Sequence, residues 1–439
     1  MNCPSEEADS AREILYLSFN QTSTALSVGS KNGYMLYDLD QVHECQPTYE
    51  SRNIEDVCII ERNFSTSLVA YVSLHSPRNL VLYNYNKGTE ILEKLFPNTV
   101  LSVKLNRKNV VVCLEDKIYI LYIMGLKDEK LHAITNTPSN VKGLITLTYG
   151  NGNSLLAYPG SCVNGNVQIF DATERHAKTT IPAHTSPLAA LAFDEDGEKL
   201  ATASIKGTVI RVFSIVHSQI LFEFRRGVKR CVEIQSLSFN IGSEFLCASS
   251  NTETVHIFKL SADEETVENI DEEGWMEMFG RVLTQSAKYL PTQMSDVLTQ
   301  QRAFATVHLP SIGQKTVSAI TKIQNINYVM IASLEGFLYI YELNTETGGP
   351  CHLVKQHRLE GPLMPFMTPI SSAITPHYSP SKTVVEDAKS SLDLENDPAS
   401  CVESNVIEPH NEDHSTKTLC ASNGIHACDE LPPLLNKVE

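Results

Sequence analysis

The segment LAFDEDGEKLATASIKGTVIRVF, residues 191–213, has the pattern of consecutive β-strands. An apolar stretch leads into a turn, a stretch of small residues follows, and after a glycine a third stretch closes on an aromatic residue. The apolar residues alternate or form runs of about four to six, which is the period and length of strands rather than helices. This segment therefore predicts neighbouring strands of one sheet.

The same pattern occurs in seven copies along the chain, and the first six begin about 40 to 46 residues apart. That spacing is typical of a four-stranded propeller blade. Sheets arranged radially bury both faces of each blade and leave few open edges. We predict an all-β fold, a single seven-bladed β-propeller of WD-repeat type at residues 13–360; the alternative is a β-sandwich with repeated turns. The copies begin at Leu17, Cys58, Ser102, Leu147, Leu191, Leu237 and Ile320.

A long insertion, residues 261–305, interrupts the repeat between the sixth and seventh copies. Its first part is an acidic run within residues 263–273. In its second part, apolar residues recur at steps of three and four until Pro291, which predicts an amphipathic helix. We therefore expect an acidic hinge followed by a helix with one apolar stripe. The stripe comprises Trp275, Phe279, Val282, Leu283, Ala287 and Leu290.

The two ends of the chain differ from the repeats in composition. Residues 1–12 are polar and acidic without an apolar core, so we expect a flexible N-terminus and no secretory signal. Residues 361–439 are rich in Pro, Ser, Asp, Glu and Asn, which predicts a disordered acidic tail. Most of the formal net charge of −17 lies in this tail and in the acidic run of the insertion. The repeats themselves are therefore nearly neutral.

Composition and motifs favour a cytosolic binding protein over an enzyme. The eleven cysteines are an odd number and include no Cys-x-x-Cys pair, which is typical of reduced cytosolic thiols. No apolar stretch approaches the roughly 20 residues of a spanning helix, so any membrane contact should be peripheral. The sequence contains no Gly-x-Ser-x-Gly nucleophile elbow, no phosphate-binding glycine-rich loop and no His-Glu-x-x-His zinc motif. We therefore expect no cofactor and no metal. An extended basic, aromatic-lined groove for nucleic acid is also lacking.

The densest group of polar residues lies on the fifth and sixth copies, around Phe224-Arg225-Arg226-Gly227. Arginine presents a planar fork of donors suited to phosphate, and hydroxyls and imidazoles add directional hydrogen bonds. Adjacent strand residues point to opposite sides, so Arg225 should face hydroxyls of blade five and Arg226 those of blade six. Two phosphate pockets are thus predicted. The alternative is a solvated cluster in which Arg225, Arg226, Lys229 and Arg230 pair with Glu223 and Glu233.

This motif, with residues 206–213 before it and 249–258 after it, resembles the PROPPIN family of autophagy β-propellers, in particular its WIPI branch. The similarity extends over most of residues 10–360. The resemblance implies binding of phosphatidylinositol 3-phosphate and phosphatidylinositol 3,5-bisphosphate at two sites. The implied first site comprises His184, Thr202, Ser204, Gly207, Thr208, Arg211 and Arg225. For Arg211 the alternative is that it orients the pocket and does not itself bind phosphate. The implied second site comprises Arg226, Gly227, Ser250, Thr254 and His256.

The resemblance also implies a peripheral scaffold that recruits autophagy machinery to preautophagosomal and endosomal membranes. Trp275, Phe279, Val282 and Leu283 of the insertion would enter the bilayer; the alternative is that this stripe packs on its own protein. The protein is expected to be a monomer, with autophagy conjugation or lipid-transfer proteins as its partners. These partners would bind a basic contact formed by Arg107 and Lys108; the alternative is that these two residues form an ordinary solvated turn. The competing hypothesis is a protein-only WD-repeat scaffold whose basic rim binds acidic peptides.

Overall fold

The computed structural model describes residues 13–123, 131–150, 152, 154–226, 231–261, 302–313 and 315–359. These residues belong to the first of two compact units, Met1–Ile370, and the second unit, Ser371–Glu439, lies outside them. The predicted flexible N-terminus, the tail and the amphipathic helix of the insertion also fall outside the described residues. The corresponding segment boundaries remain predictions.

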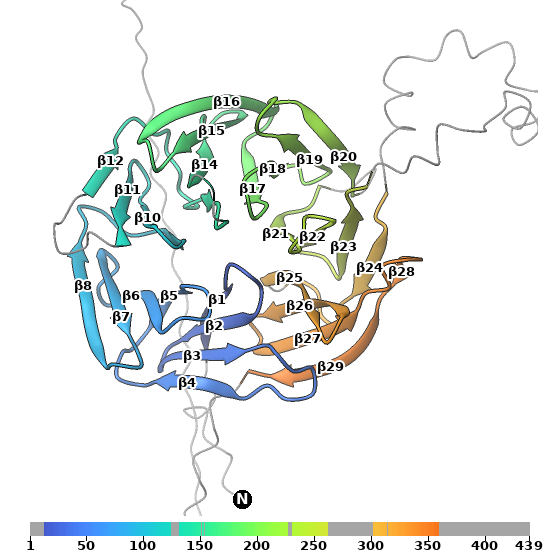
Figure 1. The fold of residues 1–439 in the computed structure, drawn as a ribbon, viewed down its shortest axis with the longest axis horizontal. Coiled ribbons are helices and arrows are strands. Elements are labelled where there is room, and N and C mark those ends of the chain that lie inside the picture. The colour runs from blue at the N-terminus through green and yellow to red at the C-terminus, as the bar shows by residue number, and fades with distance from the viewer. Residues whose placement is uncertain are drawn as a thin grey trace, which may run out of the picture. The chain divides into compact units, whose positions relative to one another are not determined.

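Seven sheets arranged around one centre, antiparallel except at the outer edge of blade six, confirm the predicted all-β propeller (Figure 1). Within the described residues every element is a strand. Blades one to four are β1 (Ile14–Phe19), β2 (Ala25–Ser30), β3 (Gly33–Asp38) and β4 (Pro47–Ser51); β5 (Val57–Arg62), β6 (Leu68–Ser73), β7 (Asn79–Asn84) and β8 (Thr89–Leu95); β9 (Ser102–Leu105), β10 (Asn109–Cys113), β11 (Ile118–Tyr122) and β12 (Leu131–Ile134); and β13 (Thr146–Leu147), β14 (Leu155–Pro159), β15 (Gly165–Asp171) and β16 (His176–His184).

Blade six is the only one of the seven described sheets with a fifth strand, β28, which pairs parallel to β24 at its outer edge. The insertion falls between β23 and β24, so it separates the third strand of blade six from the fourth. Blades five to seven are β17 (Leu188–Phe193), β18 (Lys199–Ser204), β19 (Val209–Ser214) and β20 (Ile220–Arg225); β21 (Ile234–Phe239), β22 (Phe245–Ser250), β23 (Thr254–Lys259), β24 (Ala305–His308) and β28 (Gly349–Pro350); and β25 (Thr316–Ile323), β26 (Ile326–Ser333), β27 (Phe337–Glu342) and β29 (His352–Arg358).

Apolar packing between neighbouring blades forms the core. Each buried cluster joins two adjacent blades, and one of them joins blade one to blade seven, where Leu26 and Tyr37 pack with Met330 and Ile340. The ring thus closes by packing of blade faces. Because strand residues alternate between the two faces of a sheet, each blade contributes apolar side chains to both of its neighbours.

Antiparallel order places the turns of each blade on two opposite faces of the ring. The turn between the second and third strands shares one face with the connection to the next blade, and we call this the connection face. The other two turns of each blade lie on the opposite face. No helix of the described residues is long and apolar enough to cross a membrane.

Candidate phosphate-binding site

The predicted first-site residues of blades four and five meet at the connection face. His184 ends β16 at half-buried depth, and its Nε2 lies 2.9 Å from Oγ1 of Thr202 on β18. The Thr202 hydroxyl is fully buried, and Ser204 at the end of the same strand is 6% exposed. The alternation of β18 places Thr202 and Ser204 on one side of the blade. Three predicted residues therefore converge from two neighbouring blades.

Arg211 is already engaged within the protein. Its Nε donates to Oε2 of Glu223 at 2.6 Å, and its Nη1 donates to the backbone carbonyl of Ala183 at 2.6 Å. In the ladder it lies opposite Thr202. Arg211 therefore ties the end of blade four to the outer strand of blade five and positions His184. This arrangement fits an orienting residue better than a direct phosphate ligand.

The turn after β18 completes the first pocket, and its shape depends on Gly207. This residue has φ +61° and its amide donates to the carbonyl of Ser204 at 2.9 Å. Thr208 follows at half-buried depth, and its carbonyl accepts the amide of Arg226 at 3.0 Å. Arg225 ends β20 opposite Val209 and is also half-buried. The two arginines thus begin the connection to blade six beside the turn of blade five.

Arg226 reaches away from blade five and contacts blade six. Its Nη2 donates to the hydroxyl of Ser250 at 2.6 Å, to the hydroxyl of Thr252, and to the carbonyl of Thr254 at 3.4 Å. Burial lowers the pKa of Arg226, against a smaller opposing effect of Glu253. The hydrogen-bond partners of this guanidinium are uncharged hydroxyls and a carbonyl. They do not neutralise its positive charge, which can therefore attract an anion.

Two buried polar atoms in the second pocket have no hydrogen-bond partner within the described part of the chain, namely Nε of Arg226 and Nδ1 of His256. Buried nitrogens are normally paired, so each such atom requires an explanation. The His256 ring lies 6.1 Å from that of Phe258 and stacks with it. Both atoms are therefore candidates for contact with a bound anion. Gly227, the remaining predicted residue of this pocket, lies outside the described residues.

Thr252 was not among the predicted site residues, although it contacts Arg226 directly. Its hydroxyl also lies 3.1 Å from that of Ser250. The signal was present, because Thr252 follows Ser250 by two residues in a turn rich in hydroxyls. Which of those hydroxyls reaches Arg226 depends on the turn conformation, which the residue pattern does not specify.

Both site histidines are neutral in the unliganded protein at pH 7. Burial lowers the pKa of His184 to about 4, with Arg211 adding to the effect. Burial lowers the pKa of His256 to about 4 as well, with smaller contributions from Arg226 and His308. Each imidazole therefore acts as a hydrogen-bonding group rather than as a fixed charge. An arriving phosphate dianion would raise both pKa values.

We expect the free energy of unfolding to fall as the pH drops from 7.5 to 5. In this window the unfolded histidines, with an ordinary pKa near 6.5, bind protons that the folded ones with lowered pKa do not, so protonation favours the unfolded state. The loss should be about 2 kcal/mol per histidine at pH 5. Urea unfolding of His256→Gln should show a shallower decline than the unsubstituted protein. Replacement of exposed His43 by Gln is the control, and equal slopes for the two variants would contradict the assignment.

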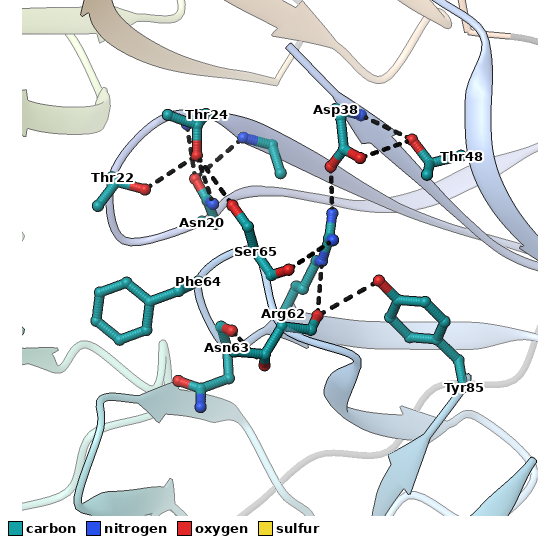
Figure 2. A network of polar contacts seen from close by, with 12 residues as sticks. Asn20, Thr22, Thr24, Asp38, Thr48, Arg62, Asn63, Phe64, Ser65 and Tyr85 are labelled. Carbon is teal, nitrogen blue, oxygen red and sulfur yellow. Dashed lines mark hydrogen bonds and ion pairs between the residues drawn. The ribbon is translucent and has the colours of Figure 1, made fainter. Parts of the chain in front are cut away.

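Arg107 and Lys108 lie far from these pockets along the ring, in the turn between β9 and β10 on the opposite face. The guanidinium carbon of Arg107 lies 4.3 Å from the centre of the Phe64 ring on blade two. Beside Phe64, Arg62 forms an ion pair of 2.5 Å with Asp38, which joins blades one and two (Figure 2). Arg107 remains exposed, so the structure provides an ordered cation at this position.

The axial cavity, about 340 Å³, is separate from both pockets. Its wall includes Glu61, which is 3% exposed and accepts hydrogen bonds from Tyr16 and Ser18 at 2.8 Å each. Lys104 pairs with the same carboxylate at 2.7 Å. The buried charge is thus satisfied by the protein itself. Of the residues that line the cavity, Ser318 has a buried hydroxyl without a hydrogen-bond partner in the described residues, but the lining has no unpaired arginine or histidine nitrogen like those of the second pocket.

The fold and these residues define a propeller with two neighbouring groups of candidate phosphate ligands at its connection face. The PROPPIN family model matches residues 14–360, so this chain belongs to the PROPPIN family. The sequence-based assignment to that family is confirmed.

Curated relatives carry names from phosphoinositide recognition and autophagy. WD repeat domain phosphoinositide-interacting protein 2 of Xenopus laevis is 51% identical over 366 residues, 83% of each chain. Human WD repeat domain phosphoinositide-interacting protein 1 is 45% identical over 346 residues, 78% of this chain and 76% of the relative. Autophagy-related protein 18 of Caenorhabditis elegans is 42% identical over 361 residues, 79% and 86% of the two chains. These names describe interacting proteins rather than enzymes.

Solved structures share the fold. Kluyveromyces lactis Hsv2 superimposes with a TM-score of 0.61 at 20% identity, and the match covers 80% of this chain and 100% of the Hsv2 chain. The complex of KlAtg21 with the coiled-coil of AgAtg16 gives a TM-score of 0.60 at 26% identity, with coverage of 79% of this chain and 99% of the other.

Proposed function

We propose that the protein is a peripheral membrane scaffold that binds phosphatidylinositol 3-phosphate and phosphatidylinositol 3,5-bisphosphate in autophagosome formation. The observation that carries this proposal is the second pocket, where a desolvated arginine and an imidazole each hold a buried nitrogen without a hydrogen-bond partner in the described residues. A phosphate oxygen accepts from such donors. The names of the relatives supply the lipid class and the cellular process.

The first pocket supports a second, different head-group contact. His184, Thr202, Ser204 and Thr208 offer hydroxyls and an imidazole, and Arg225 supplies the charge, while Arg211 is occupied by Glu223. Two weak contacts on one membrane give avidity without a strong single site. Cytosolic protein would therefore gather on membranes rich in 3-phosphorylated lipid, such as preautophagosomal and endosomal membranes.

Vesicle flotation of the full chain tests the lipid proposal. Phosphatidylcholine vesicles that contain phosphatidylinositol 3-phosphate or the 3,5-bisphosphate should carry the protein upward in the gradient. Vesicles of equal charge made with phosphatidylserine or unphosphorylated phosphatidylinositol should not. If all of these vesicles behave alike, the competing hypothesis of a protein-only scaffold is favoured.

Recruitment of autophagy proteins is the second part of the proposal, with Arg107 and Lys108 as the contact for an acidic partner segment. The structural relative in complex with an Atg16 coiled-coil motivates this choice of partner class. Stacking on Phe64 holds Arg107 in place, so little side-chain entropy remains to be lost on binding.

We expect Arg107→Glu to weaken binding of the cognate Atg16 coiled-coil by about tenfold, because charge reversal at an interface changes attraction into repulsion. Isothermal titration with the purified coiled-coil measures the effect. Lys87→Glu, a charge reversal at an exposed position on the same face of blade two, is the matched control. Equal affinity of the Arg107 variant and the control would exclude this contact.

A further inference from the structure

The turns between the second and third strands differ in character among the seven blades. Blades four and five are the neighbouring pair whose tips carry an exposed apolar side chain and no carboxylate. Val163 is 76% exposed and Ile205 is 52% exposed. The residues of these turns, in order from blade one, are 31–32, 74–78, 114–117, 160–164, 205–208, 251–253 and 334–336. Leu74 on blade two is also exposed, at 52%, but the turns of its neighbours, blades one and three, have no exposed large apolar residue.

These two tips flank the first candidate pocket. On blade four, the turn returns at Gly165, which lies opposite His184 in the ladder; a Cβ on Gly165 would lie 2.6 Å from that of His184. On blade five, Ile205 directly follows Ser204, and its amide donates to the carbonyl of Pro187 at 2.9 Å. His184 therefore pairs with the strand that follows the Val163 turn and contacts, through Thr202, the strand that precedes Ile205.

Both tips are ordered by their own backbone contacts. The amide of Val163 donates to Oγ of Ser161 at 3.1 Å, and the amide of Gly207 closes the other turn on Ser204. An isolated exposed apolar residue is normal on a protein surface. Val163 and Ile205, however, lie on adjacent ordered turns on either side of the candidate pocket for a membrane phosphate. The same lipid bilayer could therefore bury both side chains.

We propose that Val163 and Ile205 form an apolar contact with the lipid bilayer beside the first head-group pocket. This inference rests on the proposed lipid function. A phosphoinositide phosphate held between His184 and Thr208 places the membrane interface at the level of these tips, where apolar side chains enter the boundary between head groups and acyl chains. Lys206, exposed at the tip of the same turn as Ile205, is complementary to anionic lipid. The contact is distinct from the one predicted for the insertion.

Two matched double variants test the proposal. Val163→Ser with Ile205→Ser removes the apolar groups. Val354→Ser with Ile91→Ser removes the same residue types, 36% and 45% exposed, from the outer strands of blades seven and two. The first variant should bind vesicles containing phosphatidylinositol 3-phosphate about tenfold more weakly, given the usual gain from burying such side chains. The second should bind as the unsubstituted protein does.

The water-soluble dibutanoyl form of the same lipid separates the bilayer contact from the pocket. Its affinity should be unchanged in the Val163→Ser, Ile205→Ser variant, because no bilayer is present. Val163→Phe with Ile205→Phe should instead bind vesicles several-fold more tightly.

Three outcomes would overturn this inference. The first is that the Val163→Ser, Ile205→Ser variant binds vesicles as tightly as the unsubstituted protein does. This includes the case in which the variant loses only the binding of a protein partner. The second is an equal loss for vesicles and soluble lipid, which would assign these residues to support of the pocket. The third is failure of the unsubstituted protein to bind vesicles at all, which would overturn the lipid function as well.

Discussion

Replacement of Arg225 and Arg226 together by alanine is expected to reduce binding to phosphatidylinositol 3-phosphate vesicles by about 100-fold or more. A hydrogen bond to a charged group contributes about 1.5 to 3 kcal/mol, and each arginine serves a different pocket. Loss of both also removes the avidity of a two-point contact. Flotation across a series of lipid densities measures the effect.

The controls for this variant address charge and folding separately. Arg78→Ala with Lys87→Ala removes the same net charge from exposed positions of blade two and should float normally. Arg226 has internal contacts with Ser250 and Thr252, so the thermal midpoint of each variant should be measured. Each single alanine variant should weaken binding without abolishing it at high lipid density. Flotation of the double arginine variant at the level of the control would show that the motif does not bind lipid.

Arg226→Lys distinguishes a geometric role from a purely electrostatic one. Lysine keeps the charge but lacks the planar fork that contacts Ser250 and Thr252 while presenting Nε to a ligand. We expect this variant to bind nearly as weakly as Arg226→Ala. Full recovery by lysine would mean that charge alone accounts for the second pocket.

Gly207→Ala should lower the free energy of unfolding by about 3 kcal/mol or more, since a strained backbone and a steric overlap act together. A Cβ at this residue would lie 1.9 Å from the carbonyl oxygen of Val232, and φ is +61°. The opposing atom belongs to the backbone and cannot move aside as the end of a side chain would. Because Ser204 and Thr208 flank this turn, we also expect weaker lipid binding. Urea unfolding and vesicle flotation measure the two effects.

Gly242→Ala is the matched control for this substitution. Its φ is +88°, but an added Cβ would have no neighbouring atom within 4 Å. Only the cost of the left-handed conformation remains, about 1 to 2 kcal/mol. Similar losses for the two variants would indicate that the approach of Val232 is unimportant.

The repeat pattern specified the blades because strand alternation is a local property of the chain. In blade five, for example, residues 191–213 contain β18, most of β19 and the second half of β17, as the pattern predicted. Packing then follows from the same alternation, since each face must be buried against a neighbouring blade. The break in period located the insertion and assigned it to blade six, and the structure shows which strand follows it, because β24 completes that sheet.

The residues of the Phe224 to Gly227 motif show where sequence reasoning ended. Their adjacency predicted that the two arginines serve different blades, and the structure indeed places Arg226 against blade six. That either arginine binds phosphate remains a prediction. The commitment of Arg211 to Glu223 and Ala183, and the contact of Arg226 with Thr252, depend on side-chain conformations at the junction of two blades.

The sequence by itself determined the number of blades, their strands and the candidate phosphate ligands, because local periodicity and residue chemistry are written along the chain. Only the tertiary structure decided which candidates have unpaired nitrogens, that Arg211 pairs with Glu223, and which apolar turns flank the first pocket. Those properties arise between blades, where residues distant in sequence share one desolvated environment. Hydrogen-bond pairing and burial are properties of that shared environment rather than of any single residue.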